Sequence, residues 1–538
     1  MTPPTFNLID EPWIRVRRHD SEIQLMSIRE ALANASVIKA LAGEIPTQDA
    51  ALLRLLLAIL LGSVRPDHER NEQENIDLWA SWWEAGRFPD GVLDYLTGVH
   101  SRFDLLDADA PFYQVAGLTT ASGKASGLGK LIAEVPDGEP YFTTRTREEV
   151  TSLSLAEAAR WLVHCMAFDP SGIKSGAVGD DRVKGGKGYP FGYPAWAGNL
   201  GLVVAEADTL FETLLFNLPL AYSGPEDLPL WDRAPVGPGV DETHPEPHGP
   251  ADLFTWPSRR LRLFTHGARV TDAQVSNGDK LGPQNADRHE PMTAWRYSKN
   301  QSKGGHEVVM PVLHQASRRI WQGLGSILVA SEGGARAIKP RALEWLALLS
   351  EEGILAEDRT VDLHVVGFEY GPQNSVITGA IDDRLAGAVV AFTNPVLAQA
   401  AVVAAEAASE GVKALANLAS NLDRAKGGDG EAPRHDTYEQ GYALLDLPYR
   451  RWLRDLVDPA DVEATQAAWW SEARRILTDA GDRLIRDAGP AAWVGRTVTQ
   501  SGSDAPRLVD AGIADIWFRA ALAKALPLPA RQATKEIA

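Results

Sequence analysis

The sequence has almost no cysteine, since Cys165 is the single one among 538 residues. One thiol excludes an internal disulfide and any cysteine-rich zinc site. It also favours a reducing compartment, so we expect a cytoplasmic protein.

A long hydrophobic run and a targeting segment are lacking too. The most apolar stretch, 51–61, is too short to cross a bilayer and carries Arg54. With Thr47 as N-cap and Gly62 as C-cap, it predicts a buried helix instead. Residues 1–6 have neither the basic start nor the apolar core of a signal peptide. We therefore expect no membrane partner.

An overall excess of positive charge is missing. The net charge is −19, which counts against nucleic acid as a partner because phosphate binding normally needs a basic balance. Residues 251–320, however, contain eleven Lys and Arg against six Asp and Glu, a local balance of about +5. An acidic protein with such a basic sector can still bind DNA when other subunits supply further charge.

Catalytic signatures are absent as well. The sequence has no His-Glu-x-x-His and no Gly-x-Ser-x-Gly, and the segment 117–124 departs from a phosphate-binding loop in its spacing and its last residues. His244 and His248 lie in a connector rich in Pro, Gly, Asp and Glu (224–250), where we favour a solvated loop over a metal site. We expect no catalytic site, no cofactor and no metal. A hydrolase with an unrecognised site and a purely structural scaffold remain the alternatives.

Two kinds of pattern organise what is present. Residues 1–390 mix helical stretches with short strands, and Trp79 and Trp82 are expected in the core. From 391 to 538, Ala, Leu, Glu and Arg dominate with helical spacing, and four helices are expected at 395–424, 437–457, 459–489 and 509–526. The sequence predicts an α+β protein: a mixed α/β N-terminal body followed by a C-terminal four-helix bundle.

Within the body, two segments have distinctive chemistry. The stretches 361–370 and 374–380 predict two strands joined by Gly371-Pro372-Gln373. The stretch 170–192 is long, glycine-containing and rich in lysine, and is expected to form loops.

The opening string Phe6-Asn-Leu-Ile-Asp-Glu-Pro-Trp-Ile-Arg-Val16 resembles the start of the CasA (Cse) family, the large subunit of the type I-E CRISPR surveillance complex Cascade. Phe142, the glycine segment after Pro170, the Gly-Pro-Gln turn and the helical C-terminal third follow in the family's order. The resemblance implies a non-catalytic subunit that recognises the protospacer-adjacent motif in double-stranded DNA and helps to start R-loop formation. The implied partners are the backbone and small subunits, the crRNA, the target duplex and the helicase–nuclease.

The resemblance also implies site residues. Gln373 matches a glutamine that wedges into the duplex from a hairpin tip, and Phe142 matches an aromatic residue that contacts the guide RNA. A glycine loop that approaches the minor groove corresponds to 170–179, because a residue without a side chain lets the backbone come close to base edges. The family's lysine contact falls near 290–303, where Pro291-Met292-Thr293 occupies the site and no lysine aligns. The DNA-binding candidates are Gln373, Gly172, Lys174, Gly176, Gly179, Arg182, Lys184, Lys187, Arg296 and Lys299.

Overall fold

The computed structural model describes residues 5–65, 69–135, 143, 145–146, 149–189, 193–302, 306–328, 337–498 and 506–527. The chain divides into two compact units. The first comprises Met1–Arg318, Ala330–Leu355 and Val361–Arg384, and the second comprises Arg319–Val329, Ala356–Thr360 and Leu385–Ala538. No helix in the described ranges is long and apolar enough to span a bilayer.

A buried helix, α2 (Pro46–Ser63), lies at the centre of the first unit and confirms the helix expected there. Its N-cap is Ile45 and its C-cap is Val64, so the expected caps Thr47 and Gly62 lie within the helix. Every residue from 50 to 62 is buried, because the neighbouring helices cover all sides of α2. These helices are α4 (Asp90–Gly98), α5 (Leu155–Phe168) and α7 (Pro250–Phe254).

The N-terminal segment folds into a small antiparallel sheet of order β2-β1-β3. Trp79 and Trp82 on α3, later in this part of the chain, are buried as core residues, as the sequence predicts. The elements of the N-terminal segment are β1 (Ile14–Arg18), β2 (Ile23–Met26), α1 (Ile28–Ala33), β3 (Ile38–Leu41) and α3 (Glu72–Ala85). Two further helices of the first unit are α6 (Leu210–Phe216) and α9 (Arg341–Glu351).

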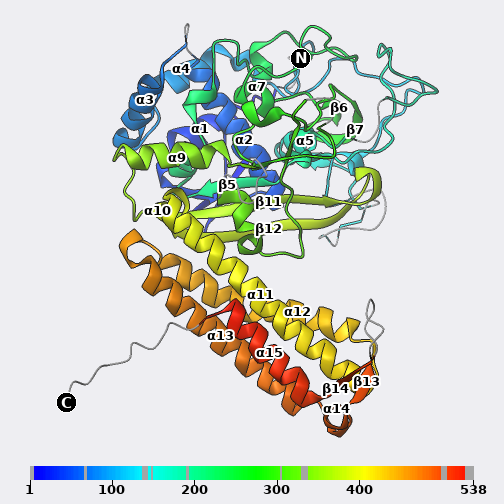
Figure 1. The fold of residues 1–538 in the computed structure, drawn as a ribbon. Helices are drawn as coiled ribbons and strands as arrows, with labels where there is room; N and C mark the ends of the chain where they lie inside the picture. The colour runs from blue at the N-terminus through cyan, green and yellow to red at the C-terminus, as the bar shows by residue number, and fades with distance from the viewer. Residues whose placement is uncertain are drawn as a thin grey trace. The chain divides into compact units, whose positions relative to one another are not determined.

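Three further sheets complete the first unit, and their orders are β4-β7-β6, β12-β11-β5 and β10-β8-β9. β11 and β12 form a long paired ribbon with β5 beside β11 (Figure 1). The strands are β4 (Leu153–Ser154), β5 (Leu202–Glu206), β6 (Arg259–His266), β7 (Arg269–Asn277), β8 (Trp295–Tyr297), β9 (Val309–Pro311), β10 (Ala337–Ile338), β11 (Thr360–Tyr370) and β12 (Ile377–Ala388).

The second unit is a helical bundle built on α11 (Pro395–Lys426), which packs against three other long helices (Figure 1). These are α12 (Glu431–Arg454), α13 (Val462–Arg486) and α15 (Ala511–Ala525). Short elements of the unit are α8 (Leu324–Leu328), α10 (Val389–Thr393), α14 (Pro490–Val494), β13 (Arg496–Val498) and β14 (Arg507–Val509). The expected α+β body and helical bundle are therefore both confirmed.

Small residues bring the bundle helices close together. A Cβ atom added to Gly411 on α11 would lie 2.7 Å from a methyl group of Leu477 on α13. One added to Gly441 on α12 would lie 2.8 Å from a methyl group of Val412. The alanine-rich face of α11 is buried for the same reason, since small side chains let several helices approach one axis.

Candidate nucleic-acid interface

The turn between β11 and β12 is a tight loop that exposes polar side chains. Gly371 N–H donates to the Val376 carbonyl at 2.8 Å and closes the turn. Gln373 and Asn374 both have left-handed backbone conformations, with φ of 58° and 53°, and both side chains are exposed. A glutamine rarely adopts this conformation, so the turn holds Gln373 in a strained geometry. Gln373 thus lies at the hairpin tip as expected, whereas its contact with DNA stays a prediction.

The stem of this hairpin is held by charged side chains from three strands. His364 on β11 makes hydrogen bonds through both ring nitrogens, to Glu206 on β5 at 2.7 Å and to Asp382 on β12 at 2.8 Å. Arg384 on β12 also pairs with both carboxylates. Burial alone would lower the pKa of His364, but the two carboxylate partners outweigh it and raise the pKa above its usual value. His364 therefore ties the hairpin to the rest of its sheet through both ring nitrogens, and the two carboxylates favour its protonated form.

The hairpin tip is joined directly to the glycine segment. Ser171 N–H donates to the Asn374 carbonyl at 2.8 Å, and a Cβ atom added to Gly172 would lie 3.9 Å from the Cβ of Ser375. Tyr370, at the end of β11, donates its hydroxyl to the Phe168 carbonyl at 2.7 Å, just before the glycine segment. Two features separated by about two hundred residues in sequence thus form one surface. Neither stretch of sequence contains a pattern that predicts this contact.

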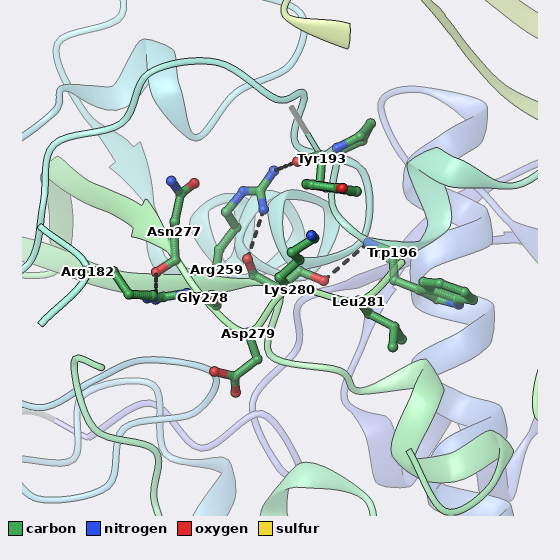
Figure 2. A pocket seen from close by; sticks show the side chains of 11 residues that line it. Arg182, Tyr193, Trp196, Arg259, Asn277, Gly278, Asp279, Lys280 and Leu281 are labelled. Atoms are coloured by element: carbon green, nitrogen blue, oxygen red, sulfur yellow. Dashed lines mark hydrogen bonds between the residues drawn. The ribbon is translucent and has the colours of Figure 1, made fainter. Parts of the chain in front are cut away.

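A buried charge cluster supports the start of the glycine segment. The Asp169 carboxylate pairs with Lys174 Nζ at 2.6 Å and with the guanidinium of Arg259 on β6. Arg259 also donates to the carbonyls of Asp169 and Pro170, at 2.9 and 3.2 Å. Figure 2 shows its further bond to the Tyr193 carbonyl, at 3.2 Å. Burial alone would raise the pKa of Asp169, but the two cations hold it below its usual value. We call Asp169, Lys174 and Arg259 the Asp169 cluster.

The structure places the basic candidates of this segment in two different environments. Lys174 is buried in the Asp169 cluster, so its ammonium group does not face solvent. Arg182 pairs with Asp180 at 3.0 Å and donates to the Gly278 carbonyl at 2.9 Å, which neutralises and fixes its charge. The phosphate contacts expected of these two side chains therefore do not fit the structure, because both already hold the loop together.

Lys184 and Lys187, in contrast, are exposed at the ends of a two-residue turn. Their backbone N–H and C=O groups pair with each other at 3.0 and 3.1 Å, and Gly185 and Gly186 between them have φ of 57° and 74°. These angles are typical of a type I′ hairpin turn, which glycine adopts without strain. Within the described residues neither ammonium group has an ion-pair partner. The turn therefore presents two positive charges to solvent.

The three candidate glycines also differ. Gly176 is buried against Val183, and its N–H donates to the Gly186 carbonyl at 2.9 Å, so packing requires the absence of a side chain there. Gly179 has φ of 91°, and a Cβ atom added to it would lie 3.0 Å from the ring of Pro238. Gly172 has φ of 115° and is the one of the three that lies beside the hairpin tip.

The remaining candidates lie elsewhere. Arg296, on β8, and Lys299, after it, are exposed, and within the described residues no hydrogen bond or ion pair joins them to the glycine segment or the hairpin tip. Met292 and Thr293, where the resemblance implies a lysine, are fully buried, and Thr293 donates its hydroxyl to the Gly201 carbonyl at 2.6 Å. Phe142 lies outside the described residues.

A small cavity lies behind the glycine segment, lined by Arg182, Tyr193, Trp196, Arg259, Asn277 and Lys280 among others (Figure 2). Its volume is about 20 Å³, which is room for a water molecule and not for a nucleotide. Lys280 Nζ lies 4.1 Å from the centre of the Tyr193 ring and covers it. The cavity is therefore too small to hold a base, whereas the hairpin tip and the lysine turn are open to solvent.

Comparison with known proteins identifies the family. The model of CRISPR-associated protein Cse1 matches residues 7–480. The CasA/Cse1 protein of Thermus thermophilus is 31% identical over 368 residues, covering 67% of each chain. Among solved structures, Thermobifida fusca Cse1 has a TM-score of 0.87 at 40% identity, covering 97% of this chain and 98% of that one. Cse1 from Acidimicrobium ferrooxidans has a TM-score of 0.80 at 29% identity, covering 98% and 99%. The chain therefore belongs to the Cse1 (CasA) family, whose members are the large, non-catalytic subunits of the type I-E CRISPR complex Cascade.

Proposed function

We propose that this chain reads the protospacer-adjacent motif in duplex DNA with the surface formed by the hairpin tip and the start of the glycine segment, and that strand separation begins there. The observation that supports this most directly is the 2.8 Å hydrogen bond between Ser171 N–H and the Asn374 carbonyl. It brings the hairpin tip and the start of the glycine segment, to which we assign the wedge and the groove contact, to the same place. The sequence of the target itself is left to pairing with the guide RNA.

The hairpin has the stiffness that a wedge needs. β11 lies between β12 and β5, and the His364 side chain links all three strands at the stem. Prying base pairs apart costs a few kcal/mol per step, so the inserted group needs a support that does not bend away. The exposed amide of Gln373 can offer a donor and an acceptor to the unpaired base edges. Asn374, which the sequence reasoning missed, exposes a second amide at the same turn.

Gly172 is the candidate for close approach to the minor groove. It has no side chain, and its backbone conformation is one that other residues rarely adopt. Backbone contacts in the minor groove distinguish A·T from G·C but little more, so we expect several related motifs to be accepted.

Lys184 and Lys187 supply phosphate contacts in this proposal. A chain with net charge −19 needs help to approach DNA, and the assembled complex provides it. We place the protein in the cytoplasm with the backbone and small subunits, the crRNA, the target duplex and the helicase–nuclease as its partners. On its own the chain should bind DNA weakly.

The test uses the complex reconstituted with guide RNA and a duplex that carries a fluorescent base analogue beside the motif. Gln373→Ala, Asn374→Ala and the double variant are compared with Gln440→Ala, an exposed glutamine on α12. We expect the complexes to assemble normally, and duplex opening to slow about tenfold or more in the double variant, since the inserted side chains offset the cost of unstacking. If the double variant opens DNA at the normal rate, the hairpin tip is not the wedge and the scaffold alternative gains support.

A further inference from the structure

The connector 224–250 ends in a cluster of metal-ligating side chains that the proposed function does not use. His244, His248 and Asp252 follow one another at intervals of four residues, and Asp252 lies in α7. One ligand atom from each of the three lies within 4.8 Å of the others. The expectation of a solvated loop is wrong for His244, because its side chain is only 12% exposed and bonds to the fully buried Asp252.

Two possible metal ligands of the cluster, Asp252 Oδ1 and the His248 imidazole, make no hydrogen bond in the described part of the chain. Asp252 Oδ2 accepts from His244 Nε2 at 2.6 Å and from the His248 backbone N–H at 3.0 Å. Asp252 Oδ1 is buried without a hydrogen bond, although Arg233 Nη1 lies 3.3 Å away. The exposed imidazole of His248 meets His244 with ring centres 4.8 Å apart and makes no hydrogen bond within the described part of the chain. A hydrogen-bonded pair of His244 and Asp252 would account for the position of His244. It would not account for the position of His248 beside the His244 ring.

We propose that His244, His248 and Asp252 bind a divalent transition-metal ion, with Zn²⁺ as the fitting example. Two imidazoles and one carboxylate form a set that Zn²⁺ takes readily, with water in the fourth position. Ligand atoms around tetrahedral Zn²⁺ lie about 3.4 Å apart, since each bond is about 2.1 Å long. In the present arrangement the ligand atoms lie within 4.8 Å of one another, so the side chains need to draw closer together to reach that spacing.

The surroundings position the ligands. Trp256 lies against the His244 ring, with ring centres 5.7 Å apart, and donates its indole N–H to the Asp279 carbonyl at 3.0 Å. A second buried carboxylate, Asp227, accepts from the Ala251 and Asp252 backbone N–H groups at 3.1 and 2.9 Å. Asp252 pairs with Arg233, and the neighbouring carboxylate of Asp227 adds a second negative charge beside the site.

A metal here would act on the reading surface through the connector. Arg260 donates to the carbonyls of Gly237 and Gly239 in the connector, at 2.7 and 2.6 Å, and Pro238 between them lies against Gly179 of the glycine segment. A metal ion held by His244 and His248 near the end of the connector and by Asp252 in α7 would make the connector more rigid. The contact between Pro238 and Gly179 would become more rigid with it. The metal is thus structural in this proposal, with one water-accessible position.

The test measures Zn²⁺ binding by isothermal titration calorimetry to the full chain, purified without a polyhistidine tag. Co²⁺ is used in parallel, because a tetrahedral site gives it visible absorption bands. The key variant is His248→Ala, whose side chain is exposed, and the matched control is His266→Ala, an exposed histidine at the end of β6. Circular dichroism verifies that each variant is folded.

We expect one equivalent of Zn²⁺ to bind the wild-type chain and the His266→Ala chain equally, and to raise the melting temperature of both. His248→Ala should bind at least tenfold more weakly, and its melting temperature should not respond to Zn²⁺. Absence of binding to the wild-type chain would overturn the proposal. So would equal binding to the His248→Ala chain, because the ion would then be held elsewhere.

Discussion

Replacing Asp169 by asparagine tests whether a single buried carboxylate supports the glycine segment. The substitution preserves the shape of the side chain and removes the charge that faces both Lys174 and Arg259. Removing one member of a buried ion pair costs about 3–5 kcal/mol, because the remaining charge stays desolvated. Burial already lowers the pKa of Lys174, so this lysine can lose its proton and relieve part of the cost. We therefore expect the substitution to lower the free energy of unfolding by about 3 kcal/mol, at the lower end of that range.

The assay is urea unfolding of the isolated chain, followed by tryptophan fluorescence, together with DNA opening by the assembled complex. With a urea dependence of about 3 kcal/mol per molar, the midpoint for the first unit should fall by about 1 M. Asp90→Asn is the matched control, since Asp90 pairs with Arg87 in an ion pair exposed to solvent, and it should leave the midpoint unchanged. DNA opening should slow even at low urea, because the loop beside the hairpin tip loses its anchor.

A second substitution separates the electrostatic explanation from a loss of packing. Lys174→Met removes the surplus cation and keeps a chain of similar length. If charge imbalance causes the instability, the double variant Asp169→Asn with Lys174→Met should have a higher urea midpoint than Asp169→Asn alone. It should recover at least half of the decrease that Asp169→Asn causes. Equal instability of the single and double variants would refute the reasoning, as would an Asp169→Asn chain that unfolds like the wild type.

Two other predictions concern charge. His364 has a raised pKa through Glu206 and Asp382, so its stabilisation is complete below about pH 6.5 and is lost as pH rises through the raised pKa. His364→Gln should thus cost about 1.5–3 kcal/mol at pH 6 and clearly less at pH 9 in urea unfolding, and a pH-independent cost would contradict a cationic histidine. Lys184→Ala with Lys187→Ala should reduce the slope of log affinity against log salt by about 0.9 per charge, and an unchanged slope would remove both lysines from the DNA contacts.

Local patterns in the sequence were sufficient for the two-part organisation and for the helices of the bundle. The helices of the bundle begin and end near the glycines and prolines that interrupt the pattern, as at Gly427 and Pro459. In the body, residues 259–277 form a hairpin of β6 and β7, turned at Gly267 with φ of 60°. An isolated glycine in a strand-like run gave too weak a signal to place that turn.

The candidate site could be predicted only in part, because a side chain's partners come from distant segments. Lys174 appeared to be a free cation in a glycine-rich loop, yet Arg259 and Asp169 bury it in a cluster. His244 appeared solvated in a polar connector, yet Asp252 and Trp256 cover it. Composition reports how polar a segment is, but burial depends on what folds over it.

The hydrogen bond between Ser171 and Asn374 has a consequence for evolution. It joins only main-chain atoms, so it does not depend on the identity of the exposed side chains at the tip, although the left-handed backbone at 374 favours Asn or Gly there. Proline at 171 would be an exception, because it removes the donor. The exposed side chains of the tip can therefore change in descendants of this protein while the main-chain link between the hairpin and the glycine segment is kept.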